Sequence, residues 1–524
     1  MSAWSVVRGP GWVRGPWSVV ERQDNGGQEN VNLTSPDHGP GNGTTDHAPG
    51  SVPGSAGPLC VDLDGTLVRG DTMVESGLGT LRASPLNWLL VPYWLLRGRA
   101  RFKAELARRG RLDIATLPWR DEVLDHLRSE RARGRRLVLA TAAHVHIADA
   151  VALHLGLFDE VVATTGAANL TGEAKAAALV ARFGERGFAY AGNERRDLAI
   201  WRRANEAIVV DCGRGLIAEI AATTPVRLVV GSDGDQLTAL ARALRPHQWL
   251  KNVLVLVPPL AAHVNDGAAW AGALLTAVAW CLAASCVYLV NDLFDLHADR
   301  VHRDKRSRPL ASGSLSPFIG IAAMPVLAVG ALVLAWLAAP GAALALAAYW
   351  CVAMAYSGLL KTLPWIDTGV LAGLFVLRLI GGGAGSGCPV SPWLLGFAGA
   401  LFLGLAFAKR AGELARQGPS PRRGYHPRDL RVLAGAGIVS GVAAVAVFAG
   451  YAHSAIAGLL YRRPALLLID AAVLALWLAW VWTLTLRGRL HHDPLVHAVR
   501  DPWSWLALLA GVAAFAAASL GLPR

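Results

Sequence analysis

The chain has 524 residues, of which 53% are hydrophobic and 17% are charged, and its mean hydropathy is +0.37. This composition excludes an ordinary soluble protein, and the length suits two or three domains. Much of the Lys and Arg behind the formal net charge of +12 lies between apolar segments, so membrane topology and anionic ligands explain it better than nucleic acid. The six cysteines show no metal-binding or disulfide spacing and are expected to be free thiols.

Residues 1–56 are predicted to be a disordered tail. The stretch QENVNLTSPDHGPGNGTTDHAPGSVPGSAG is rich in Gly, Pro, Ser, Asn and Thr and holds too few large apolar residues to form a core. No apolar stretch typical of a signal peptide is present, so secretion is not indicated.

Residues 57–235 are predicted to form an α/β, Rossmann-like domain. Short apolar segments alternate with helical ones, which is typical of a parallel sheet with helices on both faces. The predicted strands are PLCVDLD, RRLVLAT, EVVATT, FAYAG, EAIVVD and VRLVV. An insertion at residues 86–111, LNWLLVPYWLLRGRARFKAELARRGR, fits either a buried helix or a basic segment at a membrane surface.

Residues 240–524 are predicted to form an all-α membrane bundle of about nine spans. The first span is short and carries Pro258 and Pro259. Basic loops alternate with loops poor in charge, so the positive-inside bias places the basic loops and the α/β domain in the cytoplasm, at an inner or plasma membrane. The expected spans are 249–263, 269–291, 316–338, 341–360, 365–384, 391–412, 430–452, 464–486 and 502–521.

Polar side chains follow several strands of the predicted sheet. Asp62 and Asp64, in VDLDGTLV, follow the first strand, at the edge where parallel sheets bind ligands. One carboxylate can attack phosphorus, and the second can protonate the leaving oxygen. The other candidates are Thr141 and Lys175 for the phosphate, and Asn193 and Asp197, in GNERRD, for Mg²⁺.

With these four motifs, residues 57–230 resemble the haloacid dehalogenase-like hydrolases. The resemblance implies that Asp62 is the nucleophile and Asp64 the acid/base, and that both contact Mg²⁺. It also implies a cap at about residues 72–134, which would select the substrate. The fourth motif usually begins with an acid, whereas Asn193 stands here, and an amide should weaken Mg²⁺ binding. An active phosphatase and a weakened or regulatory domain both remain open.

Carboxylates gather at the end of the second predicted span. If the helix continues, Asp292, Asp295 and Asp299 lie on one face, just after Asn291. Three carboxylates repel one another unless a cation lies among them, and Mg²⁺ combines a few carboxylates with diphosphate oxygens. A basic stop-transfer loop would explain the Lys and Arg that follow but not the aspartates. Four downstream residues can bind the same diphosphate: His302, Lys305, Arg306 and Arg308.

Other loops on the same side add polar residues near the span ends. Tyr356, Lys361 and Asp367 lie in YSGLLKTLPWID, and Arg378 lies well inside the following span. An intramembrane Arg indicates a site, with Asp367 or a substrate phosphate as its expected partner. Convergence of these residues favours a site for a polyanion. The remaining basic candidates are Arg245 and Lys251 in RPHQWLKN, Lys409 and Arg410 in AFAKRAGEL, and Arg500 in HHDPLVHAVRDPW.

The pattern Asn-Asp-x-x-Asp-x-x-x-Asp, followed by Lys and Arg-Pro-Leu-Ala-x-Gly, makes residues 240–524 resemble the UbiA superfamily of intramembrane prenyltransferases. Members usually transfer a prenyl group from a prenyl diphosphate to an aromatic acceptor and carry two aspartate-rich motifs. Here the second motif keeps only Asp367. The segments RPHQWLKN, ADRVHRDKRSRPLASG, YSGLLKTLPWIDTGVLAGLFVLRLIGGGAG and AKRAGE instead resemble the decaprenyl-phosphate phosphoribosyltransferases, which make a cell-wall precursor.

This branch implies Mg²⁺-dependent transfer of a phosphoribosyl group from 5-phosphoribosyl diphosphate to a polyprenyl phosphate. Asp292 and Asp295 would be catalytic and, with Asp299 and Asp367, would hold Mg²⁺, while the basic residues would hold the phosphates. The fused hydrolase domain would then remove the 5-phosphate from the product. One alternative is an aromatic prenyltransferase with a quinone- or haem-type acceptor. Another is a transporter or scaffold, which is disfavoured because the polar residues gather at span ends rather than at mid-membrane.

Overall fold

A computed structural model describes residues 57–83, 87–97, 102, 105–106, 108–110, 112–165, 170–231, 235–417, 424–490 and 494–520. The predicted tail, residues 1–56, lies outside them. The chain divides into two compact units, the first ending at Asp233 and the second beginning at Gly234. We call them the soluble unit and the membrane unit.

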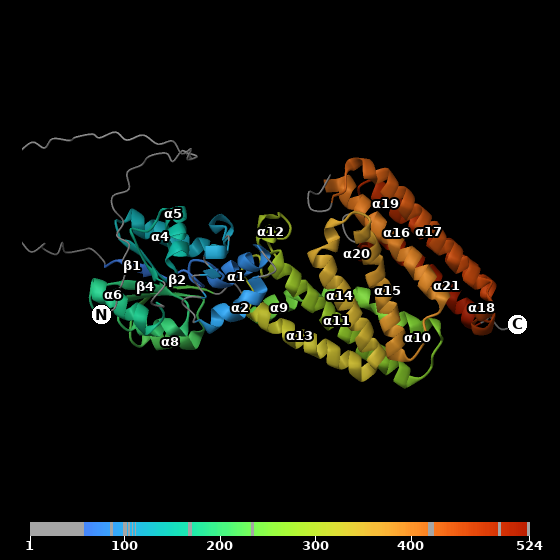
Figure 1. Ribbon diagram of the computed structural model, residues 1–524, viewed down its shortest axis with the longest axis horizontal. Coiled ribbons are helices and arrows are strands. Elements are labelled where there is room, and N and C mark those ends of the chain that lie inside the picture. Colours follow the sequence, from blue (N-terminus) through green and yellow to red (C-terminus); the bar gives the residue numbers. More distant parts are fainter. Residues whose placement is uncertain are drawn as a thin grey trace, which may run out of the picture. The chain divides into compact units, whose positions relative to one another are not determined.

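The soluble unit is built on a six-stranded sheet (Figure 1). All neighbouring strands pair in parallel, in the order β3-β2-β1-β4-β5-β6, and this confirms the predicted α/β fold. Strand β1 is central, so the chain segments that follow β1, β2 and β4 emerge side by side at one edge. The strands are β1 Leu59–Val61, β2 Leu137–His144, β3 Glu160–Thr164, β4 Ala189–Gly192, β5 Glu206–Val210 and β6 Val226–Val230.

Helices cover both faces of this sheet. Leu59 and Val61 pack into a core cluster with residues of α4 and α5, whereas Cys60 packs into a second cluster with α6 and α7. Figure 1 shows α4 and α5 on one side of the sheet and α6 and α8 on the other. The helices, with η for short 3₁₀ turns, are α1 Thr72–Ala83, α2 Asn87–Leu96, η1 Ile114–Thr116, α4 Asp121–Ala132, α5 Val145–Leu155, α6 Glu173–Phe183, η2 Arg195–Asp197, α7 Leu198–Trp201 and α8 Arg214–Ala221.

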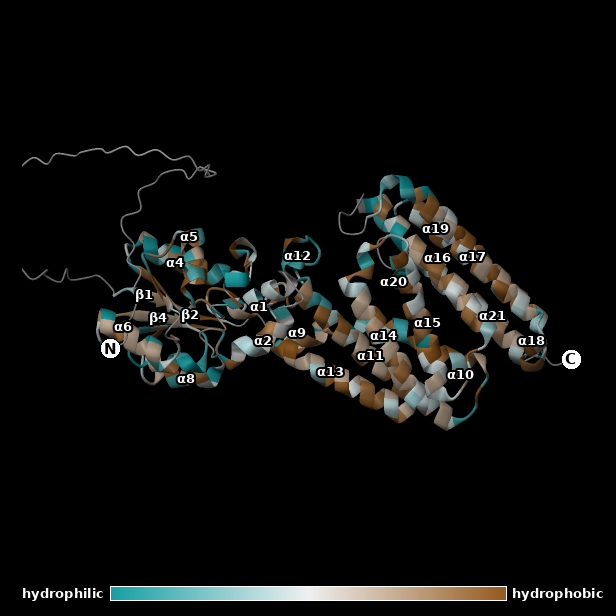
Figure 2. Cartoon of the chain, viewed as in Figure 1, coloured by the Kyte–Doolittle hydropathy of each residue, from teal (hydrophilic) through white to brown (hydrophobic). Residues whose placement is uncertain are grey.

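The membrane unit is all helical, as predicted. Figure 2 shows hydrophobic residues along most of its helices. Eight of the described helices are long and apolar enough to cross a membrane, against about nine expected. The helices are α9 Gln236–Ala243, η3 Pro246–Leu256, α10 Val257–Ala261, α11 Gly267–Phe294, α12 Leu296–Val301, α13 Pro317–Ala338, α14 Pro340–Gly358, η4 Leu360–Thr362, α15 Ile366–Ser386, α16 Pro392–Gln417, η5 Pro427–Asp429, α17 Leu430–Ala452, α18 Ala455–Leu460, η6 Pro464–Leu466, α19 Leu467–Leu486, α20 Pro494–Arg500 and α21 Pro502–Leu520.

The first expected span, 249–263, is the 3₁₀ segment η3 followed by the short helix α10. Pro258 and Pro259 have no amide hydrogen to donate, and they sit at the start of α10, where a helix tolerates that loss. Small residues bring this segment and the long helices close together. A Cβ atom on Gly382 of α15 would lie 2.0 Å from the Val255 carbonyl, and one on Gly272 of α11 would lie 2.1 Å from the Gly385 carbonyl.

Many charged side chains of the membrane unit gather where α11, α14 and α16 end and α15 begins. We call this the charged end of the bundle. Ion pairs join these helix ends, since Lys361 lies 3.8 Å from Asp295 and Arg410 lies 2.5 Å from Asp367. In contrast, large apolar side chains such as Val326 and Leu344 are more than 70% exposed along the spans, as expected of a surface that contacts lipid.

Two candidate active sites

The candidate site of the soluble unit lies at the edge where β1, β2 and β4 end. Asp62 follows β1 directly, Thr141 lies within β2 rather than after it, and Asn193 follows β4. Lys175 reaches the site from α6 and lies 3.0 Å from the Asp62 carboxylate. The structure therefore brings together the four sequence motifs, which lie far apart along the chain.

Tyr190, which sequence reasoning did not identify, links two of the predicted residues. Its hydroxyl accepts a hydrogen bond from Lys175 at 3.0 Å and donates one to Asp197 at 3.0 Å. All three side chains are buried. Burial opposes the charge on Lys175, but Asp62 and Asp197 raise its pKa overall, so the ammonium stays charged beside the nucleophile position. A tyrosine inside an apolar strand has no sequence pattern that sets it apart from a core residue.

The two predicted catalytic carboxyls both have raised pKa values. Burial raises the pKa of Asp62 to about 6, opposed by Lys175. Burial, together with the charges of Asp71 and Asp62, raises the pKa of Asp64 to about 8, although Asp64 accepts hydrogen bonds from the Thr72 amide and hydroxyl. Crowded negative charge of this kind fits a divalent cation, which would favour the ionised forms.

Asn193 and Asp197 contribute differently to this edge. The Asn193 side-chain oxygen accepts a hydrogen bond from the Thr66 hydroxyl at 3.3 Å and remains a possible oxygen ligand. Both Asp197 oxygens are engaged, one by Tyr190 and the other by the backbone amides of Asn193 and Glu194. Asp197 thus fixes the turn that carries Asn193, which fits an indirect role in metal binding. Within the described ranges no three His, Cys, Asp or Glu side chains form a ready metal site, so Asn193 or phosphate oxygens would have to complete the shell.

The candidate site of the membrane unit lies at its charged end. Asp292 pairs with Arg245 and, at 3.1 Å, with Arg308. Arg308 also lies 2.5 Å from Asp299, and Lys305 lies 3.8 Å from the same carboxylate. Asp292 and Asp299 are each only 2% exposed. Two of the three predicted aspartates are therefore close together, with Arg308 between them.

Asp295 departs from the predicted stack of three aspartates. The helix breaks for one residue there, because Asp295 ends α11 before α12 begins at Leu296. Its carboxylate is partly exposed and faces Lys361. The remaining Asp292 oxygen, Oδ2, is buried and has no hydrogen-bond partner among the described residues. That orphaned oxygen fits a cation, since a buried carboxylate oxygen without a partner is costly.

Asp367, the remnant of the second aspartate-rich motif, is fully buried in a network with Arg410. Its two oxygens accept hydrogen bonds from Arg410 Nε and from the Tyr425 hydroxyl, each at 2.5 Å. Arg410 also donates to the Tyr356 hydroxyl at 2.7 Å and to Glu413 at 2.6 Å. Because both oxygens are occupied, this geometry favours a role for Asp367 in orienting Arg410 rather than the expected role as a metal ligand.

Arg378 does not pair with Asp367, so that expected partner is wrong. Its guanidinium donates to the Asn252 side chain at 2.9 Å, to the Leu374 carbonyl at 2.6 Å and to the Tyr349 hydroxyl at 3.2 Å. It also lies 4.8 Å above the Tyr349 ring. Neutral oxygens thus satisfy the buried cation, which holds η3, α14 and α15 together.

The other predicted residues of the membrane unit lie in or beside α11, α12, α16 and η3. Asn291 precedes Asp292 in the last turn of α11, and Lys409 precedes Arg410 in α16. His302 is exposed, and its Nδ1 accepts a hydrogen bond from the Asp304 amide. Lys251 lies in η3, next to Asn252.

Comparisons with known proteins support both units. Residues 59–202 match the haloacid dehalogenase-like hydrolase family, and residues 253–499 match the UbiA prenyltransferase family. The chain is 35% identical over 459 residues to the uncharacterized protein y4nM of Sinorhizobium fredii, covering 86% of this chain and 88% of that protein. It is 37% identical over 190 residues to the decaprenyl-phosphate phosphoribosyltransferase of Mycolicibacterium smegmatis, covering 35% of this chain and 59% of that protein. The solved structure of a UbiA homolog from Archaeoglobus fulgidus bound to GPP and Mg²⁺ aligns with 17% identity and a TM-score of 0.43, covering 53% of this chain and 99% of that one.

The chain therefore carries a UbiA prenyltransferase domain in its membrane bundle and a haloacid dehalogenase-like hydrolase domain ahead of it. Both family resemblances seen in the sequence are confirmed. The chain is an integral membrane enzyme with a transferase part and a phosphatase-like part.

Proposed function

We propose that the membrane unit transfers a phosphoribosyl group from 5-phosphoribosyl diphosphate to a polyprenyl phosphate, at the cytoplasmic face of the membrane. The observation that carries this proposal is the buried pair of Asp367 and Arg410. It provides a guanidinium where family members usually have a second group of metal-binding aspartates. An additional cation suits two substrates that both bring phosphates. The similarity to a decaprenyl-phosphate phosphoribosyltransferase supports the same choice of substrates.

In this reaction an oxygen of the lipid phosphate attacks the anomeric carbon of the ribose. The bond from that carbon to the diphosphate breaks, and no strong base is needed because the attacking oxygen is already anionic. Mg²⁺, when bound, would neutralise charge on the departing diphosphate. Asp292, Asp295 and Asp299 would hold that ion.

The ion pairs at the charged end supply cations for the phosphates. Arg245, Arg308 and Lys305 pair with Asp292 and Asp299. When Mg²⁺ and the donor bind, these side chains can exchange a carboxylate partner for a phosphate oxygen and remain charge-paired. This exchange avoids leaving buried charges uncompensated at either stage.

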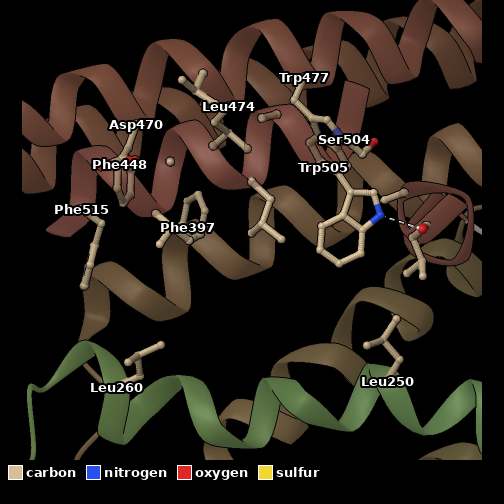
Figure 3. A pocket seen from close by; sticks show the side chains of 17 residues that line it. Leu250, Leu260, Phe397, Phe448, Asp470, Leu474, Trp477, Ser504, Trp505 and Phe515 are labelled. Carbon is tan, nitrogen blue, oxygen red and sulfur yellow. Dashed lines mark hydrogen bonds between the residues drawn. The ribbon is translucent and has the colours of Figure 1, made fainter. Parts of the chain in front are cut away.

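An apolar pocket in the membrane unit provides a place for the isoprenoid chain. Its volume is about 680 Å³, and it lies among η3, α10, α16, α17, α19, α20 and α21. Phe397, Phe448 and Trp505 contribute rings to its wall, and Asp470 is the single charged residue among the described residues that line it (Figure 3). An apolar wall of this size matches a lipid tail and offers nothing to a sugar phosphate.

The donor assay tests this proposal directly. Purified protein in nanodiscs with Mg²⁺ is expected to move label from 5-phosphoribosyl diphosphate onto a polyprenyl phosphate. Use of a prenyl diphosphate with an aromatic acid, and no reaction with the first pair, would instead establish an aromatic prenyltransferase.

We also propose that the soluble unit removes the 5-phosphate from the lipid-linked product. The geometry fits this chemistry, since Asp62 can attack phosphorus while Lys175 neutralises the phosphate. Asp64, with its pKa raised to about 8, can carry the proton that the leaving oxygen needs at neutral pH. Water then hydrolyses the aspartyl-phosphate, and inorganic phosphate leaves.

The raised pKa values predict that Mg²⁺ activation of the phosphatase depends strongly on pH. With a pKa of about 8, Asp64 keeps its proton in roughly 99% of metal-free molecules at pH 6, and Mg²⁺ must displace that proton. The Mg²⁺ concentration for half-maximal hydrolysis of p-nitrophenyl phosphate is therefore expected to be roughly 100-fold higher at pH 6 than at pH 9. An activation constant that is the same at both pH values would contradict this assignment.

Asn193→Asp serves as a matched variant for that titration. It adds a carboxylate at the position where the amide oxygen lies and should lower the activation constant about tenfold at pH 9. If the wild-type protein hydrolysed p-nitrophenyl phosphate without Mg²⁺ at every pH, the hydrolysis would not depend on the metal, and the proposed role of Mg²⁺ would be wrong.

Asp367→Asn is predicted to weaken donor binding without changing the need for Mg²⁺. The neutral side chain no longer holds the Arg410 guanidinium by an ion pair, so KM for 5-phosphoribosyl diphosphate should rise at least about tenfold. Arg410→Lys should behave in the same way, because lysine cannot contact Asp367 and Tyr356 together. If the Mg²⁺ activation constant of transfer rose instead, Asp367 would be a metal ligand.

A further inference from the structure

Helix α2 of the soluble unit presents apolar side chains outward. Leu90, Tyr93 and Leu96 are 37%, 48% and 88% exposed. These residues follow one another at intervals of three, so they lie along one side of the helix. A soluble domain seldom leaves such a row uncovered.

The side of α2 next to this row is fixed to the domain. The Asn87 side chain donates a hydrogen bond to the Thr80 carbonyl at 2.7 Å, and Trp94 is 4% exposed. The Arg109 guanidinium covers the Trp94 ring at 4.9 Å. The outward direction of Leu90, Tyr93 and Leu96 is therefore set by packing.

A run of basic residues follows the exposed row. Residues 97–111 contain seven Lys and Arg residues and one acidic residue, Glu105, a net charge of +6 (seven minus one). Arg97 lies 4.6 Å above the Tyr93 ring, so a cation stands directly beside the exposed aromatic group. Aromatic side chains next to Arg and Lys are typical of the boundary between water and an anionic membrane.

The chain itself keeps the soluble unit near a bilayer. Only five residues separate the last strand, ending at Val230, from α9, which begins at Gln236 in the membrane unit. A fully extended stretch of this length spans about 20 Å. A weak membrane-binding surface is effective under such a tether, because binding occurs at a high local concentration of lipid.

We propose that α2 binds the surface of an anionic bilayer, to which the net charge of the following run attracts it. Leu90, Tyr93 and Leu96 enter the interface, and the Arg97 guanidinium beside Tyr93 contacts lipid phosphates. This inference rests on the proposed function and extends it. The contact holds α2 next to the membrane in which the lipid-linked phosphomonoester lies. The substrate class of the soluble unit is then a phosphate on a membrane-anchored carrier rather than a free sugar phosphate.

Photocrosslinking in the full chain tests the contact. p-Benzoylphenylalanine is placed at position 96 and, as a control, at position 153, where Leu153 of α5 is 71% exposed and no basic run follows. In nanodiscs that contain phosphatidylglycerol, position 96 is expected to give at least about tenfold more lipid adduct than position 153. Adducts with peptides of the membrane unit or of a second copy, or equal yields at both positions, would overturn the proposal.

Hydrolysis rates then test what the contact does. Leu96→Glu is expected to lower hydrolysis of the lipid-linked phosphomonoester about tenfold and to leave p-nitrophenyl phosphate hydrolysis unchanged, whereas Leu153→Glu should change neither rate. Equal loss of both activities in Leu96→Glu would overturn the proposal. If the wild-type protein released no phosphate from either compound, the phosphatase assignment would fail, while the crosslinking result would still decide whether α2 binds lipid.

Discussion

Asp292→Asn is expected to lower phosphoribosyl transfer at least about 1,000-fold, a loss of about 4 kcal/mol of transition-state stabilisation. Asp292 is buried, it pairs with Arg245 and Arg308, and its second oxygen has no partner among the described residues. An amide keeps the shape of the side chain but carries no negative charge to neutralise the charge of a metal ion. The rate is measured by transfer of label from 5-phosphoribosyl diphosphate to polyprenyl phosphate in nanodiscs.

Two comparisons make this result interpretable. Asp304→Asn changes an exposed carboxyl in the segment between α12 and α13 and should leave transfer unchanged. Hydrolysis of p-nitrophenyl phosphate by Asp292→Asn should equal that of the wild type, which shows that the soluble unit of the variant is folded. Asp292→Ala is less informative, because it leaves two arginines without their carboxylate partner and can destabilise the bundle by about 3–5 kcal/mol. Transfer by Asp292→Asn within tenfold of the wild type would exclude Asp292 as a metal ligand.

The arrangement of the soluble site could be predicted closely from the sequence because the order of the strands in the sheet determines it. Strands β2, β1 and β4 are neighbours, so residues that follow them meet whatever the lengths of the intervening segments. Tyr190 could not be predicted, since its role depends on a hydroxyl that reaches Lys175 and Asp197 across the sheet edge. Neither the apolar strand around Tyr190 nor its spacing from Lys175 indicates that contact.

For the membrane site, the sequence predicts which charged residues take part but not which residues they contact. The sequence places Asp292, Asp367 and Arg378 near span ends or inside spans, and a low dielectric requires each charge to find a partner. Which partner it finds depends on helix rotation and on the one-residue break at Asp295. Arg378 consequently contacts neutral oxygens, and Asp367 pairs with Arg410, 43 residues away.

Asp62→Asn is expected to separate the two reactions of the chain. Without the nucleophilic carboxylate, release of inorganic phosphate should fall at least about 1,000-fold, because no aspartyl-phosphate can form. Transfer should continue at the wild-type rate, and the lipid product should accumulate with its phosphomonoester intact. Mass spectrometry of the lipid product after incubation with both substrates distinguishes the phosphorylated from the dephosphorylated form.

The control is Asp125→Asn, which changes an exposed carboxyl of α4 that pairs only with a neighbouring arginine of the same helix in the described structure. It should yield the dephosphorylated lipid, as the wild type does. If Asp62→Asn also yields the dephosphorylated lipid, the soluble unit does not act on this product through Asp62. If wild-type protein accumulates the phosphorylated lipid but cleaves p-nitrophenyl phosphate, the soluble unit is a phosphatase for a different substrate. Only loss of phosphate release together with undiminished transfer supports two consecutive reactions on one lipid carrier.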